Sequence, residues 1–289
     1  MPGWIEIGER VFVRRYAFLD QAVGLIVGEQ DALLVDTRST MVQAQELLRD
    51  IAQVTRLPVA HVVNTHGHAD HAFGNAAFRP AAIWAHARCP AFLRRTAPDQ
   101  WEWLRETHPS LADELAWEHG TGEPGWAPTL PDRLVAESAL IDLGGRAVEL
   151  RYLGRGHTDH DLVVIAPDAG VVFVGDLLEN GAPPQFDDGF PLDWPGTLLA
   201  LLAIVERAPP AGGDWTVVPG HGEPAGVDFV RGQAALLDLI ASLGRAINTG
   251  QMLMEDAIEL LPFATEHPDL AQGAFERTLE QLRGELTLD

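Results

Sequence analysis

The stretch Thr65-His66-Gly67-His68-Ala69-Asp70-His71 places three histidines and one aspartate within six residues. It directly follows the apolar residues 61–64, which are typical of a β-strand. Histidine is the commonest metal ligand because its imidazole is substantially neutral near pH 7. Four such polar groups packed together need partners if they are buried. The stretch therefore predicts a metal-binding loop at the end of a strand.

Three later strand-like stretches also end in a glycine followed by a side chain that can bind a metal. Residues 147–153 lead into Gly156-His157, 171–174 into Gly175-Asp176, and 216–218 into Gly220-His221. Each pattern alone is weak, because a glycine after a strand usually marks an ordinary turn. Ligand sites in α/β proteins lie at the carboxyl ends of strands, so we expect the four loops to meet at one edge.

Strand-like and helix-like stretches alternate along the chain, which indicates an α/β fold. Short β-rich runs at 9–16, 22–27 and 32–35 suggest an opening antiparallel meander. Thr40 and Gln43 fit a capping box before an amphipathic helix. Further strands are expected at 59–64, 133–136 and 162–166, a helix at 197–207, and mostly helical structure at 228–289.

The length and composition are those of a folded globular protein. The chain has 289 residues, of which 46% are hydrophobic and 21% are charged, so it is long enough for one large α/β domain. Its single cysteine, Cys89, excludes an intramolecular disulfide, and we expect it to be a small buried apolar residue. No apolar run reaches the ~18 residues of a membrane span. The N-terminus does not read as a secretory signal, so we expect a cytoplasmic protein.

The charge is strongly negative, with 42 acidic residues against 20 basic residues and a net charge of −22. Such a surface repels phosphate backbones and anionic lipids, so we expect a small-molecule substrate rather than nucleic acid or membrane partners. All the basic residues are arginines, which excludes chemistry that needs a lysine. A substrate carboxylate would need an arginine, backbone N–H groups or a metal. The oligomeric state is left open.

The order His66-x-His68-x-Asp70-His71, followed by one histidine, one aspartate and one histidine, resembles the metallo-β-lactamase superfamily over residues 5–225. The resemblance implies a four-layer αβ/βα sandwich, with 1–289 as one domain, a helical insertion at 88–130 and a helical C-terminal part at 228–289. It further implies the following ligands: His66, His68 and His157 for a first metal, Asp70, His71 and His221 for a second, and Asp176 bridging both. Asp36 resembles an acidic residue of the family, which we expect to orient a ligand.

Nitrogen and oxygen ligands without a thiolate favour Zn²⁺, two ions per chain, with iron or manganese as other options. Water between two divalent ions loses a proton near neutral pH. We therefore expect a hydrolase in which a metal-bound hydroxide attacks an ester-like carbonyl, as in a lactone or thioester. Asp70 is the expected catalytic residue, because it can hold a metal and also orient the nucleophile.

Three other functions are weighed against this one: a β-lactamase, a mononuclear iron oxygenase of the persulfide dioxygenase type, and a non-catalytic family member. A non-catalytic member is expected to lose ligands, and this chain keeps all seven. The absence of lysine and the acidic character of 228–289 count against a glutathione thioester as substrate.

Two features remain open at this point. The Trp-rich segment 88–130 either packs its own aromatic side chains or forms a cap that lines a substrate entrance. His160, close to His157, is either a proton donor in the pocket or a turn residue bonded to the backbone.

Overall fold

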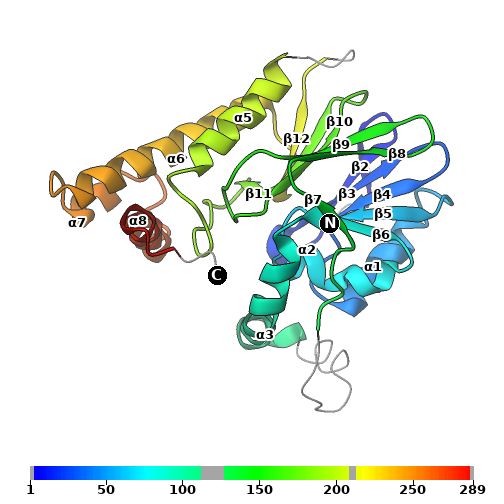
Figure 1. Cartoon of the computed structure of the whole chain (residues 1–289), viewed down its shortest axis with the longest axis horizontal. Helices are drawn as coiled ribbons and strands as arrows, with labels where there is room; N and C mark the ends of the chain where they lie inside the picture. Colours follow the sequence, from blue (N-terminus) through cyan, green and yellow to red (C-terminus); the bar gives the residue numbers. More distant parts are fainter. Residues whose placement is uncertain (1–2, 112–126, 208–212, 287–289) are drawn as a thin grey trace.

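Two β-sheets pack face to face between outer layers of helices (Figure 1). The computed structural model describes residues 3–111, 127–207 and 213–286. Apolar side chains fill three successive interfaces: helices against the first sheet, sheet against sheet, and the second sheet against helices. The predicted four-layer αβ/βα sandwich is therefore confirmed.

The first sheet has its seven strands in chain order. They are β1 (Ile5–Gly8), β2 (Val11–Arg15), β3 (Ala22–Val27), β4 (Ala32–Val35), β5 (Val59–Val63), β6 (Ala82–His86) and β7 (Arg133–Val135). Pairing is antiparallel from β1 to β4, which confirms the opening meander, and parallel from β4 to β7. Neither β1 nor β6 was predicted from the sequence.

The second sheet has the order β12-β11-β10-β9-β8. Its strands are β8 (Ser138–Asp142), β9 (Ala147–Tyr152), β10 (Leu162–Ala166), β11 (Val171–Glu179) and β12 (Thr216–His221). Only β11 and β12 pair in parallel. Strand β8 was not predicted, and β11 is five residues longer than the predicted 171–174, which changes the setting of Asp176.

The side chains of β10 alternate between the two faces of its sheet, and each face contacts a different layer. Leu162 and Val164 face the other sheet, whereas Val163 and Ile165 face the outer helices, as expected for a strand buried on both sides. Those helices are α5 (Trp194–Arg207), α6 (Val227–Asn248), α7 (Met254–Ile258) and α8 (Pro268–Arg283), which lie together on the left of Figure 1.

The first sheet is covered on its outer side by α1 (Met41–Ile51), whose Ala44, Leu47 and Ile51 enter the core. The Thr40 side chain accepts a hydrogen bond from Gln43 N at 3.1 Å, so the predicted N-cap is confirmed. Short helices α2 (Ala69–Ala72), η1 (Phe18–Asp20), η2 (Phe73–Phe78) and η3 (Pro109–Leu111) lie in the connections. Among the described helices, none has the length and apolar character needed to cross a membrane.

The predicted insertion contributes one long helix, α3 (Cys89–Thr107). Cys89 is a buried free thiol at its start, as expected, and burial raises the pKa of this thiol. Trp101 packs against the apolar cluster under α3, whereas Trp103 is 49% exposed. Trp117 and Trp126 lie outside the described residues.

Candidate metal centre

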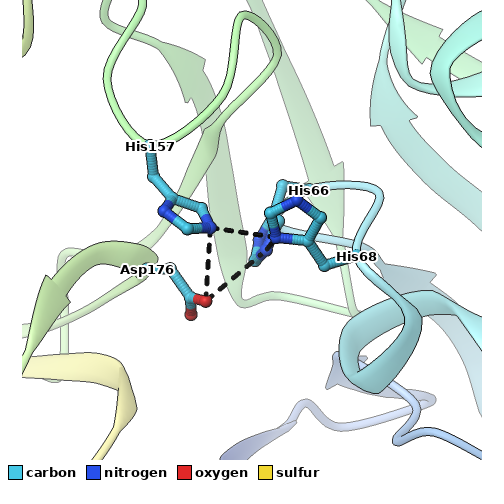
Figure 2. Close-up of side chains that lie close together, drawn as sticks. All are labelled: His66, His68, His157 and Asp176. Carbon is cyan, nitrogen blue, oxygen red and sulfur yellow. Dashed lines mark hydrogen bonds and ion pairs between the residues drawn. The ribbon is translucent and has the colours of Figure 1, made fainter. Parts of the chain in front are cut away.

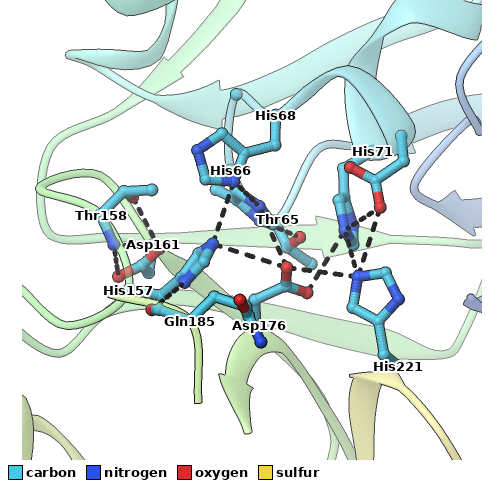
Figure 3. A network of polar contacts seen from close by, with 12 residues as sticks. Thr65, His66, His68, His71, His157, Thr158, Asp161, Asp176, Gln185 and His221 are labelled. Carbon is cyan, nitrogen blue, oxygen red and sulfur yellow. Dashed lines mark hydrogen bonds and ion pairs between the residues drawn. The ribbon is translucent and has the colours of Figure 1, made fainter. Parts of the chain in front are cut away.

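All seven side chains that the sequence predicts as metal ligands converge at one edge of the two sheets (Figure 3). They form two groups, within each of which the ligand atoms lie no more than 4.8 Å from one another. One group is His66, His68, His157 and Asp176, and the other is Asp70, His71 and His221. These groups match the two sets that the family resemblance implied.

In the first group, three imidazole nitrogens meet at a point (Figure 2). His68 Nδ1 lies 3.0 Å from His66 Nε2 and 2.9 Å from His157 Nε2. His66 and His68 come from the loop after β5, whereas His157 comes from the loop between β9 and β10. The two sheets thus contribute ligand atoms to the same point.

Asp176 connects the two groups. Its Oδ2 lies 3.6 Å from His66 Nε2 and 3.5 Å from His157 Nε2. The same carboxylate lies 3.3 Å from His71 Nε2 through Oδ1 and 3.3 Å from His221 Nε2 through Oδ2. In the second group, Asp70 Oδ2 is 3.2 Å from His71 Nε2 and 3.3 Å from His221 Nε2.

The backbone around Asp176 differs from the sequence prediction. A turn was expected at Gly175-Asp176, but β11 continues to Glu179 with a register shift between Phe173 and Gly175. Such an irregularity re-aims the following side chain without ending the strand. Gly175 has φ +55°, and a Cβ there would lie 2.6 Å from Thr65 Oγ1, so this crossing point of the two sheets requires glycine.

Every ligand histidine holds its other ring nitrogen against an acceptor outside the cluster. His157 Nδ1 faces Gln185 O at 3.3 Å, and His221 Nδ1 faces Leu19 O at 2.7 Å. Carbonyl oxygens accept only, so these ring nitrogens carry the N–H. The nitrogens that point into the cluster are then the ones that could bind a metal.

The remaining histidines have carboxylate or hydroxyl partners. His71 Nδ1 lies 2.8 Å from Asp36 Oδ2, so Asp36 orients a candidate ligand as the sequence analysis expected. Asp36 also accepts hydrogen bonds from Thr65 N and Thr65 Oγ1, and His66 Nδ1 faces the same hydroxyl at 3.1 Å.

Asp188 belongs to the candidate site but was not predicted from the sequence. Its Oδ2 lies 3.0 Å from His68 Nε2, which directs His68 Nδ1 inward. The Asp187-Asp188 pair follows no recognisable ligand spacing and is 120 residues from His68, so no sequence signal could have identified it.

The electrostatics of the two groups differ. Burial lowers the pKa of His66 well below its usual value and that of His157 to about 4. Burial also lowers the pKa of His71 and His221, but nearby carboxylates, chiefly Asp176 and Asp70, outweigh it and raise both well above the usual value. Protons thus compensate the carboxylates of the second group where no cation is bound.

These features fit a bound cation. Lone pairs of three imidazoles that meet within about 3 Å repel one another unless a cation or proton lies among them. Asp176 Oδ1 is buried and accepts no hydrogen bond from the described residues. A donor set of histidine nitrogens and carboxylate oxygens without sulfur is suited to Zn²⁺, and also to iron or manganese.

A cleft of about 570 Å³ opens above the two groups. Its walls are mostly apolar, but they carry five carboxylates in addition to the candidate ligands: Asp20, Asp99, Glu179, Asp187 and Asp188. Burial, together with the nearby Asp176, raises the pKa of Glu179 to about 8. Trp103 also lines this cleft, so the segment 88–130 serves both expected purposes: Trp101 packs internally and Trp103 borders the entrance.

His160 does not face the cleft. It is fully buried, its Nε2 accepts a hydrogen bond from Gly67 N at 3.1 Å, and its Nδ1 lies 2.7 Å from Asp159 Oδ1. These contacts fit the second of the two open interpretations, a residue bonded to the backbone. His160 fixes the conformation of the loop that carries His66 and His68.

Comparison with known proteins identifies relatives of this chain. A family model described as "Metallo-beta-lactamase superfamily" matches residues 17–221. A type 2 metallo-β-lactamase of Bacillus cereus is 26% identical over 204 residues, which are 69% of this chain and 66% of that enzyme. A type 2 metallo-β-lactamase of Bacteroides fragilis is 22% identical over 209 residues, or 71% of this chain and 70% of the enzyme.

Solved structures share the fold. A metallo-β-lactamase of Pseudomonas aeruginosa, in its mono-zinc form, superimposes with a TM-score of 0.60 at 20% identity and covers 81% of this chain and 94% of its own. A metallo-β-lactamase from Pontibacter korlensis gives a TM-score of 0.59 at 20% identity, covering 81% and 98% of the two chains.

Proposed function

Because the chain belongs to the metallo-β-lactamase superfamily, we propose that it is a binuclear metal-dependent hydrolase of ester-like carbonyl compounds such as lactones or thioesters. The observation that carries the proposal is the pair of ligand groups that share Asp176. Seven donors exceed one tetrahedral site but suit two sites with a bridging carboxylate.

The residues have distinct parts in this proposal. His66, His68 and His157 would hold one cation, Asp70, His71 and His221 would hold the other, and Asp176 lies close enough to both groups to serve both. When bound, two Zn²⁺ ions supply a Lewis acid for the carbonyl oxygen and lower the pKa of water to about 7. Asp36 and Asp188 face the outer ring nitrogens of His71 and His68, so the inner nitrogens are the ones that would bind a metal once a proton is displaced.

Asp70 is the proposed catalytic residue. Its Oδ2 lies near two histidines of the second group, and the residue lines the cleft. Its backbone oxygen accepts a hydrogen bond from the Gln21 side chain, which is fully buried. The carboxylate is therefore held at the floor of the cleft, where it can orient a water molecule toward a bound carbonyl.

β-Lactam hydrolysis is a second candidate, because the curated relatives are named metallo-β-lactamases. β-Lactam antibiotics carry a carboxylate near the ring, and the described lining of the cleft offers this group no arginine. Iron oxygenase chemistry is a third candidate, since the same donors bind iron. It requires one metal ion and leaves Asp70, His71 and His221 without a ligand role.

The experiment is elemental analysis of the purified chain, followed by rate measurements with matched lactone, thioester and β-lactam substrates. We expect about two zinc ions per chain and hydrolysis of the lactone or thioester. One iron per chain with oxygen consumption would support the oxygenase instead, and faster turnover of the β-lactam would support the lactamase.

A further inference from the structure

The cleft above the metal centre has no arginine in its described lining, and its only basic side chains there are the candidate ligands His68, His157 and His221. The chain contains no lysine, and all 20 of its arginines lie within the described ranges. Arg15 contacts the lining residue Asp20 at 2.7 Å, and it is also held by Glu223 at 2.7 Å. Away from the candidate metal ligands, a substrate carboxylate in this cleft would meet carboxylates and no guanidinium group.

Two of the cleft carboxylates have no ion-pair or hydrogen-bond partner in the described structure. Asp20 is paired with Arg15, and Asp188 is bonded to His68. Asp99 and Asp187 are exposed and lack such a partner among the described residues. Their negative charge is therefore available to a bound molecule.

An aromatic surface accompanies one of these charges. Asp99 and Trp103 are four residues apart on α3, so they share one face of the helix, and both line the cleft. The Trp103 side chain is 49% exposed. The face of an indole ring attracts cations, and it does so best for alkylammonium groups that are weakly hydrated.

The buried side chain of Glu179 provides a second, independent reason to expect a positively charged ligand in the cleft. Glu179 is only 5% exposed, and its Oε1 is buried without a hydrogen-bond partner among the described residues. The side chain lines both the cleft and a second cavity of about 560 Å³, which also contacts Phe229 and Phe263. Burial disfavours the charged form of this carboxyl group, and a positively charged ligand at this border would favour that form.

From the exposed carboxylates, the indole face and the unpaired Glu179 oxygen together, we infer that the cleft selects substrates carrying an organic cation, such as an alkylammonium group. The mostly apolar walls accommodate the carbon skeleton of such a group. This inference rests on the proposed hydrolase function and specifies the substrate class of the same site.

The test uses three esters that share one leaving group and differ only at the end of the acyl chain. The ends are trimethylammonium, its uncharged isostere tert-butyl, and carboxylate. With the zinc-loaded enzyme, we expect kcat/KM to be about tenfold higher for the cation than for the isostere and lowest for the anion. The preference should shrink at an ionic strength of about 0.5 M.

Two double variants test whether the preference for the cationic ester arises in the cleft. Asp99→Asn combined with Asp187→Asn should reduce the ratio of cation to isostere severalfold. Asp214→Asn combined with Asp238→Asn is the matched control, because both residues are exposed and neither lines a cavity described above. An equal or higher kcat/KM for the anion, or a ratio that the first double variant leaves unchanged, would overturn the inference.

Binding measurements separate this inference from the proposed hydrolysis. Ethers that correspond to the three esters cannot be hydrolysed, and calorimetry with them should give the same order of affinity. If no ester is hydrolysed but the cationic ether binds most tightly, the hydrolase proposal fails and the charge preference stands. If esters are hydrolysed without regard to charge, the preference fails and the hydrolase proposal stands.

Discussion

His71 Nδ1 lies 2.8 Å from Asp36 Oδ2, and both side chains are buried at the point where the loop after β4 meets the loop after β5. The same carboxylate accepts hydrogen bonds from Thr65 N at 2.8 Å and Thr65 Oγ1 at 2.9 Å. Asp36 therefore fixes both the orientation of one candidate ligand and the start of the loop that carries three others.

Replacement of this carboxylate should weaken metal binding without removing a ligand. An asparagine at position 36 keeps the shape but loses the charge that stabilises the inward-facing tautomer of His71. We expect Asp36→Asn to lower the affinity for the second zinc ion by about 10–100-fold, measured by competition with a chromophoric chelator. Asp238→Asn on the exposed face of α6 is the control, and equal affinities in the two variants would contradict the role of Asp36.

Gly220 lies beside the Asp176 carboxylate, so its replacement tests the position of this carboxylate without substituting any candidate ligand. A Cβ at Gly220 would lie 1.8 Å from Asp176 Oδ1, so Gly220→Ala must displace this carboxylate. We expect the variant to lose the second metal ion and at least tenfold in kcat. Gly196→Ala in α5 is the matched control, because its Cβ meets nothing within 4 Å. Full metal content in Gly220→Ala would show that the position of Asp176 is unimportant.

Acid should release the two metal ions in sequence. Carboxylates hold the pKa of His71 and His221 well above the usual value, whereas burial keeps the pKa of His66 low and that of His157 at about 4. A metal must displace protons from groups with a raised pKa, so affinity at the second group falls as the pH falls, by about tenfold per pH unit for each proton displaced. At the first group, His66 and His157 are already unprotonated, and only His68 has a raised pKa, because the contact with Asp188 outweighs its burial, so fewer protons must be displaced.

The measurement is zinc per chain after dialysis at pH 7.5 and at pH 5.5. We expect a decline from two ions toward one, with activity decreasing below about pH 6. Simultaneous loss of both ions, or full activity at pH 4, would not agree with this order.

Chelation should abolish turnover and also destabilise the fold. Metal ions that bind only the folded chain stabilise it by mass action, about 4 kcal/mol when the free metal concentration is 1,000 times Kd. EDTA treatment should therefore lower the melting temperature by several degrees, and added Zn²⁺ should restore both properties. Undiminished turnover after thorough chelation would exclude a metal-dependent reaction.

The local part of the metal centre was predictable from the sequence, whereas its long-range contacts were not. The loop from His66 to His71 is local, so spacing alone identified four candidate ligands. Asp176 was predicted as a ligand because it follows a glycine after an apolar run. The turn predicted there was wrong, because the same residues also occur in an irregular strand, and β11 continues through them. The long-range partner Asp188 has no local pattern, since its contact with His68 exists only after the two sheets have packed.

The strands missed by the sequence analysis have a similar explanation. β1 (Ile-Glu-Ile-Gly), β6 (Ala-Ile-Trp-Ala-His) and β8 (Ser-Ala-Leu-Ile-Asp) each contain no more than two β-branched or aromatic residues, so their composition gives little β signal. The charge of the cleft was also not predictable from composition. The net charge of −22 says that acidic residues are abundant, but only the folded chain brings Asp99, Glu179 and Asp187 to the lining of one cleft.

The central claim is that Asp176 joins two metal sites, and the most direct measurement is the metal content of the purified chain and of its Asp176→Ala variant by mass spectrometry. We predict about two zinc ions per native chain and no more than one in the variant. An equal metal content in both proteins, or a native chain that holds no transition metal after growth with zinc, would contradict the account.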